Sequence, residues 1–166
     1  MIYCHPVTEL DKNRAKWFSA EMLIAYECAR RGLVVSVPLA PCPYDILVDT
    51  GCLIKRIQVK RAKFKLKQGG MNSRRDREHY WVDLTKHSRG HDHRRIPANS
   101  FDFLAAVCEP DLIYLIPHDK LIAEDGRMLR GIGIKMPTEG RLDSIKAGQR
   151  WEAYRNNIDS VVEDGR

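Results

Sequence analysis

The sequence has no apolar run long enough to cross a membrane and no beginning typical of a secreted protein. None of its apolar stretches approaches the ~18 residues of a membrane-spanning helix. Residues 1–6 contain no basic region followed by an apolar run, so we expect no signal peptide. The five cysteines are widely spaced and form no C-x-x-C pair, which favours reduced thiols over a disulfide framework. We therefore expect a cytoplasmic protein with no membrane partner.

Internal repeats and low-complexity blocks are also missing from the 166 residues. A chain of this length buries ~70% of its unfolded surface without help from disulfides. We expect a single domain over residues 1–166, with a core at about 14–122, basic loops at about 63–98 and a C-terminal helical extension at about 141–162.

The positive charge is concentrated in one segment. Residues 55–95 contain fourteen Lys and Arg against four Asp and Glu, a net charge of +10, whereas the rest of the chain has a net charge of −4. A focused basic patch attracts polyanions and speeds their encounter with the protein. This concentration favours a nucleic-acid partner over an ordinary solvated surface.

Two short apolar segments carry polar residues in a pattern typical of paired strands. Residues 44–48 predict one strand, residues 49–52 a hairpin turn, and residues 53–60 an antiparallel return. The two-residue period sends Ile57 and Val59 to a core face, and Gln58 and Lys60 to the opposite face. We expect Asp45 to reach the same place as Gln58 and Lys60.

An acid, an oxygen donor and a lysine around one point suit a Mg²⁺-dependent phosphodiester hydrolase. The oxygen donors hold a hard cation, which polarises the phosphate and activates a water. The lysine ammonium positions that water or neutralises developing charge.

At these residues the sequence resembles the PD-(D/E)XK nuclease superfamily. Pro43 and Asp45 form a P-x-D variant, and Gln58-Val59-Lys60 a Q-x-K variant. The likeness is greatest to the group I intron-associated homing endonucleases of this superfamily, through a helix with Glu21, a Gly-x-x-Val-x-x-Pro segment at 32–38, Tyr44-Asp45 and the Gln-Val-Lys strand. Weaker similarity at residues 101–105 and 113–117 extends the match over about 14–122.

The resemblance implies an α/β fold with a restriction-endonuclease-like mixed β-sheet flanked by helices. It implies Mg²⁺, or Mn²⁺ in its place, held by Asp45, Gln58 and the Val59 carbonyl, with Glu21 in support. Lys60 would orient the attacking water, so the implied catalytic residues are Glu21, Asp45, Gln58 and Lys60. It also implies a homo-oligomer, a dimer or a tetramer, because one site cuts one strand.

Each of these residues has a structural alternative. Asp49 competes with Asp45 as the ligand. Glu21 lies on an apolar helix face with Phe18, Met22 and Ala25, so it needs a partner, and an ion pair with Arg14 or Lys16 would supply one. Gln58 replaces the usual acid and contributes no charge, which is compatible with a catalytically silent binding protein. Lys60 also lies in a basic run and would then be an ordinary surface lysine.

The basic segment supplies the predicted nucleic-acid contacts. A zinc site formed by His87, His91 and His93 with Cys108 is a less favoured alternative, because no close cysteine pair accompanies the histidines. Tyr80 and Trp81 are predicted to be core residues rather than stacking platforms. The predicted contact residues are Lys63, Lys65, Lys67, Arg74, Arg75, Arg77, Arg89, His91, Arg94 and Arg95.

The remaining elements follow from periodicity and turn residues. Trp17, Met22, Leu23, Tyr26 and Ala29 predict the buried side of a helix over residues 13–30, which Gly32 ends. We expect strands at 33–37, 79–84 and 112–116, a basic loop at 65–78, and a second polar stretch without core residues at 85–95. Helices are expected at 101–107 and 148–162.

The hypothesis with most support is a Mg²⁺-dependent DNA endonuclease of the homing-endonuclease type. Two alternatives remain open. One is a Holliday-junction resolvase with the same catalytic residues, and the other is a catalytically inactive DNA-binding protein.

Overall fold

A five-stranded mixed sheet forms the centre of the computed structural model, which describes residues 9–67, 77–87, 93–97, 99–109, 112–135 and 150–163. β3 and β8 pair in parallel, and the other neighbours pair antiparallel. The expected α/β fold with a mixed sheet is therefore confirmed. In spatial order the strands are β1 (Val34–Ser36), β2 (Ile46–Asp49), β3 (Ile54–Arg61), β8 (Phe103–Glu109) and β9 (Leu112–Pro117).

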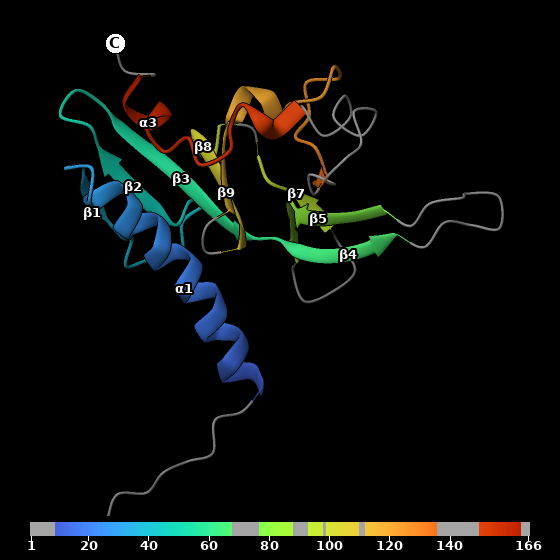
Figure 1. Cartoon of the computed structure of the whole chain (residues 1–166). Helices are drawn as coiled ribbons and strands as arrows, with labels where there is room; N and C mark the ends of the chain where they lie inside the picture. The colour runs from blue at the N-terminus through green and yellow to red at the C-terminus, as the bar shows by residue number, and fades with distance from the viewer. Residues whose placement is uncertain are drawn as a thin grey trace, which may run out of the picture.

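Helix α1 (Glu9–Ala29) covers one face of this sheet (Figure 1). Ala20, Ile24 and Cys28 recur every four residues and are buried against Ile57 and Val59 of β3. Gly32 ends the helical segment with a φ of 82°, and the Leu33 N–H donates to the Cys28 carbonyl at 3.3 Å, the pattern of a left-handed helix end.

The buried side of α1 differs from the predicted one. Tyr26, predicted on the buried side of the helix, is 63% exposed, and Phe18, predicted on an apolar face beside Glu21, is 60% exposed. Residues of one buried stripe must be three or four positions apart, and large apolar side chains drew the prediction to the wrong stripe. The small side chains of Ala20 and Cys28 are the ones that allow the helix to lie close to the sheet.

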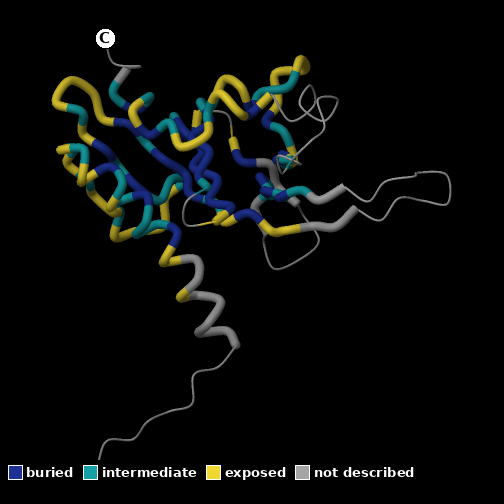
Figure 2. Tube along the Cα trace, in the orientation of Figure 1, coloured by how far each residue is buried: buried dark blue, intermediate teal, exposed yellow. Residues whose placement is uncertain are grey.

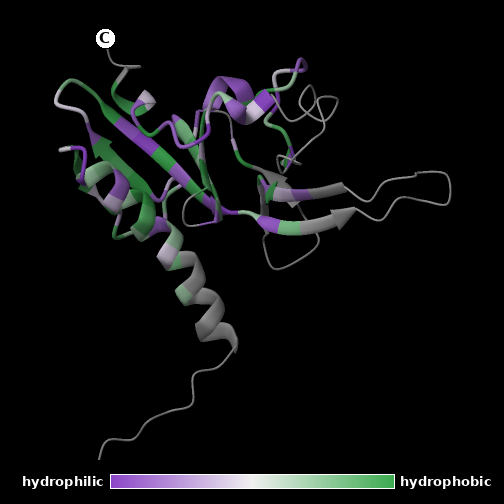
Figure 3. Cartoon of the chain, viewed as in Figure 1, coloured by the Kyte–Doolittle hydropathy of each residue, from purple (hydrophilic) through white to green (hydrophobic). Residues whose placement is uncertain are grey.

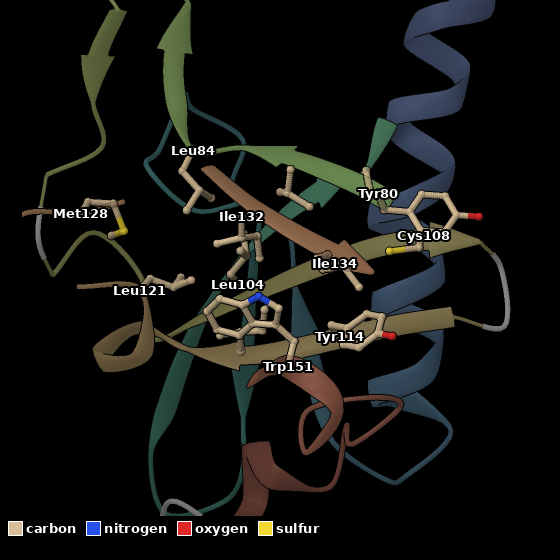
Figure 4. Close-up of a cluster of buried hydrophobic side chains, with 14 of the residues drawn as sticks. Tyr80, Leu84, Leu104, Cys108, Tyr114, Leu121, Met128, Ile132, Ile134 and Trp151 are labelled. Atoms are coloured by element: carbon tan, nitrogen blue, oxygen red, sulfur yellow. The ribbon is translucent and has the colours of Figure 1, made fainter. Parts of the chain in front are cut away.

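The opposite face of the sheet packs on a second hydrophobic cluster (Figure 4). Leu104 and Tyr114 of the central sheet meet Trp151 and Leu121 from later segments of the chain. A three-stranded antiparallel sheet, in the order β10-β5-β4, contributes Tyr80 and further residues from one of its faces. Its strands are β4 (Lys63–Lys67), β5 (Arg77–Asp83) and β10 (Gly131–Lys135).

β4 continues almost directly from β3. Only Ala62 separates the two strands, and its N–H donates to the Val107 carbonyl at 2.9 Å. The ribbon of β4 and β5 extends away from the body of the molecule on the side opposite β1 and β2 (Figure 1). Figure 2 shows the buried strands through the middle of the molecule and the exposed segments around them.

The segments expected as basic loops contain strands. β4 and β5 take up both ends of the predicted loop at 65–78, of which residues 68–76 lie outside the described part of the chain. β6 (Thr85–His87) pairs with β7 (His93–Arg95) inside the predicted polar stretch at 85–95. Polar composition misled the prediction, because a sheet with one solvated face tolerates polar residues at every second position.

Two predicted helices are wrong. Residues 101–107 were expected to be helical, but the segment forms β8 between β3 and β9, because a short buried apolar run does not distinguish a strand from a helix. Residues 148–162 do not form one helix within the described range. Helical residues at 150–152 are followed by turns, and Asn156 exchanges hydrogen bonds with Ile113 before α3 (Ser160–Glu163) begins.

η1 (His118–Leu121), a 3₁₀ helix, follows β9 and leads toward β10. No helix in the described ranges is long and apolar enough to span a membrane.

Candidate active site

Asp45 and Gln58 face each other where β2 and β3 meet. The β2–β3 ladder pairs Ile46 with Ile57, and the Asp45 N–H donates to the Ile57 carbonyl at 2.9 Å. This pairing places Asp45 directly across from Gln58. The competing acid Asp49 lies at the other end of β2, where its Oδ1 accepts a hydrogen bond from the Gly51 N–H at 2.8 Å. Asp49 thus serves the hairpin turn.

The Asp45 carboxylate is held by hydrogen bonds from β3. Its Oδ2 accepts from the Val59 N–H at 2.7 Å and from the Gln58 amide Nε2. The same Nε2 donates a longer hydrogen bond, 3.4 Å, to the Val59 carbonyl oxygen. The N–H and the C=O of Val59 therefore both face this cluster, because β2 has no residue left to pair with them.

The alternation predicted for β3 agrees with the structure. Ile57 and Val59 are buried against α1, whereas Gln58 and Lys60 belong to the opposite face of the strand. Gln58 is 6% exposed and Lys60 is half-buried. In Figure 3, β3 carries more hydrophilic residues than β2 and β8 on either side of it.

Glu21 of α1 completes the cluster through its charge. Burial raises the pKa of Glu21, the nearby Asp45 carboxylate raises it further, and the Lys60 ammonium opposes both effects. The charges that act on Glu21 are therefore those of the other predicted site residues. The alternative ion pair with Arg14 or Lys16 falls on side chains outside the described part of the chain and stays a prediction.

Burial also raises the pKa of Asp45. The Val59 N–H, the Lys60 charge and the Gln58 amide all favour the ionised carboxylate, but together they do not outweigh the effect of burial. Two partly buried carboxylates in one place repel each other and disfavour the doubly charged state. A bound cation would relieve that repulsion.

The donors that converge here suit a hard metal ion. They are the carboxylates of Glu21 and Asp45, the amide of Gln58 and the carbonyl of Val59, and oxygen ligands of these kinds are the ones that Mg²⁺ prefers. Within the described ranges no group of three or more His, Cys, Asp or Glu gathers to hold a metal. A metal here would therefore need the amide oxygen of Gln58 as a ligand in addition to the two carboxylates. For this, Oε1 rather than Nε2 of Gln58 must face the cation.

An ion pair beside the site was not predicted. Arg56, two residues before Gln58, donates from its backbone N–H to Asp102 Oδ2 at 2.7 Å and from Nη2 to Oδ1 at 2.9 Å. The Asp102 N–H donates back to the Arg56 carbonyl at 2.8 Å. These bonds fix the start of β3 against β8. The weak motif at residues 101–105, which contains Asp102, was the available signal.

The predicted nucleic-acid residues are only partly described. Lys63 is exposed on β4. Arg74, Arg75, Arg89 and His91 lie outside the described residues. The structure gives backbone positions for the other five, which are Lys65 and Lys67 in β4, Arg77 in β5, and Arg94 and Arg95 in β7.

Two further predictions concern a zinc site that includes Cys108 and the burial of Tyr80 and Trp81. Cys108 is buried, and burial raises its pKa to about 12, which keeps the thiol protonated at neutral pH. Its three histidine partners fall on side chains outside the described part. Tyr80 is a core residue, as predicted, but Trp81 is not, because it lies on the other face of β5 and is only half-buried.

A cavity of about 360 Å³ lies elsewhere, between η1 and the C-terminal segment. None of its lining residues belongs to the carboxylate cluster. They are Asp119, Lys120, Ile122, Arg150, Trp151 and Tyr154.

Comparisons with known proteins identify the family and the fold. A family model described as PD-(D/E)XK endonuclease matches residues 14–154. The chain belongs to the PD-(D/E)XK endonuclease family. Among solved structures, this PD-(D/E)XK chain is similar to the bacterial homing endonuclease I-Ssp6803I, with a TM-score of 0.69 and 22% identity over 92% of this chain and 94% of that one. That likeness is one of fold. A search of curated proteins found no match.

Proposed function

We propose that this PD-(D/E)XK endonuclease is a Mg²⁺-dependent DNA endonuclease of the homing-endonuclease type, with Mn²⁺ able to replace Mg²⁺. The observation that carries the proposal is the convergence of Asp45, Gln58 and Val59 at one point, with Glu21 and Lys60 close enough to act on the same charges. The proposal extends the family assignment to a metal, a substrate and a set of residues.

Asp45 and Glu21 provide the negative charge of the site. With Gln58 Oε1 and the Val59 carbonyl, they would hold the metal, which when bound polarises the scissile phosphate and lowers the pKa of a water. The hydrogen bond from the Val59 N–H keeps the Asp45 carboxylate in a fixed orientation. Such preorganisation means that the site does not need to rearrange as charge develops.

Lys60 is the cation of the site. Its charge opposes the rise that burial causes in the pKa of both carboxylates. Its ammonium would orient the attacking water and stabilise negative charge on the phosphate as the bond breaks. A lysine suits both roles, because its three donors rotate on a flexible stem.

DNA is the proposed substrate because of the charge distribution. The net charge of +10 over residues 55–95 begins at the strand that carries Gln58 and Lys60. The similar solved structure is that of a bacterial homing endonuclease. A homo-oligomer, a dimer or a tetramer, is proposed as well, because two strands must be cut and each chain supplies one site.

One observation favours the catalytically inactive alternative. The Gln58 amide donates to Asp45 and so satisfies the carboxylate without any metal. A DNA-binding protein of the same fold could retain this arrangement. A four-way-junction resolvase would use the same residues as the proposed endonuclease and differ only in the shape of the DNA that it cuts.

Cleavage assays on linear and four-way DNA with Mg²⁺ separate these possibilities. In Lys60→Ala we expect a cleavage rate roughly 10²–10⁴-fold lower, the usual effect of removing a positioned group that takes part in acid–base catalysis. Lys120→Ala is the matched control, because Lys120 is an exposed lysine paired with Asp119 at 2.6 Å, outside the site. Equal rates for wild type and Lys60→Ala would refute the proposal. Preferred cleavage of four-way DNA would favour the resolvase.

A further inference from the structure

The face of β3 that carries Gln58 and Lys60 also carries Arg56. Side chains alternate along a strand, so these three residues share the face opposite α1. Leu47 of β2 lies across from Arg56, as Asp45 lies across from Gln58. Every second residue of a strand is about 7 Å further along it, which is therefore the distance from the Arg56 Cα atom to that of Gln58. Register and alternation thus place Arg56 beside the carboxylate cluster.

The guanidinium of Arg56 is held in one orientation by two partners. Its Nη2 and Nε donate to the Asp102 carboxylate at 2.9 and 3.2 Å, and its Nη1 donates to the Asn99 carbonyl at 2.9 Å. Asn99 has a left-handed φ of 66°, and its N–H donates to His118 Nε2 at 3.1 Å. The His118 N–H donates to the Asp102 carbonyl at 2.9 Å. A guanidinium that is ordered in advance loses little freedom when it binds an anion.

The side chain of Arg56 is not needed to join β3 to β8, because the backbone of residue 56 already does so. Its N–H donates to Asp102 Oδ2 at 2.7 Å, and its carbonyl accepts from the Asp102 N–H at 2.8 Å. Both bonds would form with any residue other than proline at this position. Partly exposed ion pairs add little to stability. A structural role therefore leaves the guanidinium without a clear purpose.

The guanidinium has donors to spare. Arginine has five N–H donors, and the contacts with Asp102 and Asn99 use three of them, which leaves one on Nη1 and one on Nη2 among the described contacts. The side chain is 36% exposed, so an anion from solvent can reach these donors. N–H groups on a planar cation fit the oxygens of a phosphate. The catalytic face of β3 thus offers a phosphate contact.

We propose that Arg56 binds a non-scissile phosphate of the DNA, within about two nucleotides of the bond that is cut. This inference rests on the proposed function and adds a substrate contact to it. The ~7 Å between Arg56 and Gln58 along β3 equals about two nucleotides at ~3.4 Å of rise for each. Asp102 orients the guanidinium, but it also brings a negative charge close to the bound phosphate.

The salt dependence of DNA affinity tests the contact. A labelled duplex is titrated into the full-length protein without Mg²⁺, so that no cleavage occurs. In Arg56→Gln we expect the slope of log affinity against log salt to fall by about 0.9, the contribution of one phosphate contact. Arg31→Gln is the matched control, because Arg31 also has carboxylate partners, Glu27 and Asp159, but lies just beyond α1. An unchanged slope in Arg56→Gln, or an equal fall in both variants, would overturn the proposal.

Asp102→Asn separates a substrate contact from a purely structural role. Asparagine retains an oxygen that can accept from the backbone of Arg56, while the guanidinium loses its counter-ion. We therefore expect the salt slope of this variant to be at least as steep as that of wild type. If the ion pair acted only by bracing β3, Asp102→Asn would weaken DNA binding as Arg56→Gln does, and the proposal would be wrong. Because Asp102→Asn retains the arginine, this test holds even if Arg56→Gln does not fold, and thermal melts establish that.

Steady-state cleavage with Mg²⁺ gives an independent measurement. A phosphate that does not react is bound equally well in the ground state and the transition state. Arg56→Gln should therefore raise KM about tenfold, as for the loss of a hydrogen bond to a charged group, and leave kcat nearly unchanged. A loss of kcat like that expected for Lys60→Ala, with an unchanged KM, would place Arg56 in the chemistry of the cluster and contradict the phosphate site.

Failure of this inference is distinguishable from failure of the proposed function. A wild type that neither binds nor cleaves duplex DNA contradicts the proposed endonuclease itself. A wild type that binds and cleaves DNA, with an unchanged slope and KM in Arg56→Gln, removes only the phosphate site at Arg56.

Discussion

Gln58 stands at the motif position where the superfamily that this chain resembles usually has an acid. It is 6% exposed and touches the Asp45 carboxylate, so a charge added there would have little access to water. The residue therefore balances two demands. A carboxylate would bind a cation more strongly, and an amide avoids a third negative charge in the metal-free protein.

Gln58→Glu should reveal this balance. We expect tighter Mg²⁺ binding, because the variant adds a charged oxygen ligand, and a lower melting temperature at neutral pH without metal, because like charges then crowd one buried place. Gln58→Ala should weaken binding. Calorimetric titration with Mg²⁺ and thermal melts with and without the ion measure both effects. Equal Mg²⁺ affinity in all three proteins would exclude Gln58 as a ligand.

Glu21 should give the stability of the metal-free protein a distinctive pH dependence. The pKa of Glu21 is raised in the folded state. Its contribution to the free energy of unfolding is therefore fully present below the ordinary carboxylate pKa and is lost as the pH rises through the raised value. Removing the Glu21 charge should therefore increase the free energy of unfolding most at higher pH. We expect Glu21→Gln to become more stable relative to wild type between acid and neutral pH, as measured by urea unfolding at several pH values.

Glu27 on the same helix is the matched control with the opposite sign. Arg31 Nη1 bonds its carboxylate at 2.6 Å, and this bond, together with Arg30, lowers its pKa despite the effect of burial. The contribution of Glu27 is present above the ordinary carboxylate pKa and is lost as the pH falls through the lowered one. Glu27→Gln should therefore lose stability relative to wild type as the pH rises. Parallel curves for the two variants would contradict the charge arrangement around Glu21.

At the scale of elements, β10 depends on glycine at one of its two glycine positions. A methyl group on Gly131 would collide with the Trp81 ring at 2.5 Å and with the Val82 carbonyl oxygen at 2.7 Å. Gly131→Ala should destabilise the protein by about 1–3 kcal/mol, the usual cost of forcing extra volume into a packed place. Gly133→Ala should cost less, because its nearest neighbours would be 3.7 and 4.0 Å away. Denaturant unfolding of both variants measures the difference.

The sequence predicted some elements better than others, for physical reasons. The hairpin of β2 and β3 could be recognised because turn residues bound two short segments whose two-residue period leaves one register. β8 was mistaken for a helix because its apolar residues are buried on both sides by two clusters, and a segment buried all round has no period to read. The face of α1 was missed because helix–sheet distance, which selected Ala20 and Cys28, depends on the sheet.

The same reasoning explains the site. Asp45, Gln58 and Lys60 could be placed together from local strand geometry. The position of Glu21 near them came from resemblance, because the packing of α1 on the sheet is not readable from the helix alone. Arg56 and Asp102 are 46 positions apart, and Trp81 and Gly133 are farther apart still, so no local pattern connects either pair.

At the scale of the whole molecule, two hydrophobic clusters share one sheet. Phe103, Ala105 and Val107 of β8 face one cluster, and Leu104 and Ala106 face the other. Neither cluster can be lost while β8 stays in place, so the described core should unfold as one cooperative unit.

Unfolding of a variant with Trp151 as its sole tryptophan tests this cooperativity. Ile24→Ala removes buried volume from the cluster under α1, and it should lower stability by about 2–5 kcal/mol. Although Trp151 belongs to the other cluster, its fluorescence midpoint should shift by the same amount as the circular-dichroism midpoint. An unchanged fluorescence midpoint would mean that the two sides of the sheet unfold separately.

Because only Ala62 separates β3 from β4, the two strands keep a fixed distance and a fixed orientation along the chain. Lys60 and β4 belong to one nearly uninterrupted extended segment, so a count of residues sets both the distance from Lys60 to each β4 residue and the side that each residue faces. Inserting one residue at Ala62 would reverse which side every later β4 residue faces, whereas inserting two would restore the sides and lengthen the spacing by about 7 Å. The one-residue insertion should therefore lower the melting temperature more than the two-residue insertion, because it turns Phe64 away from Tyr80.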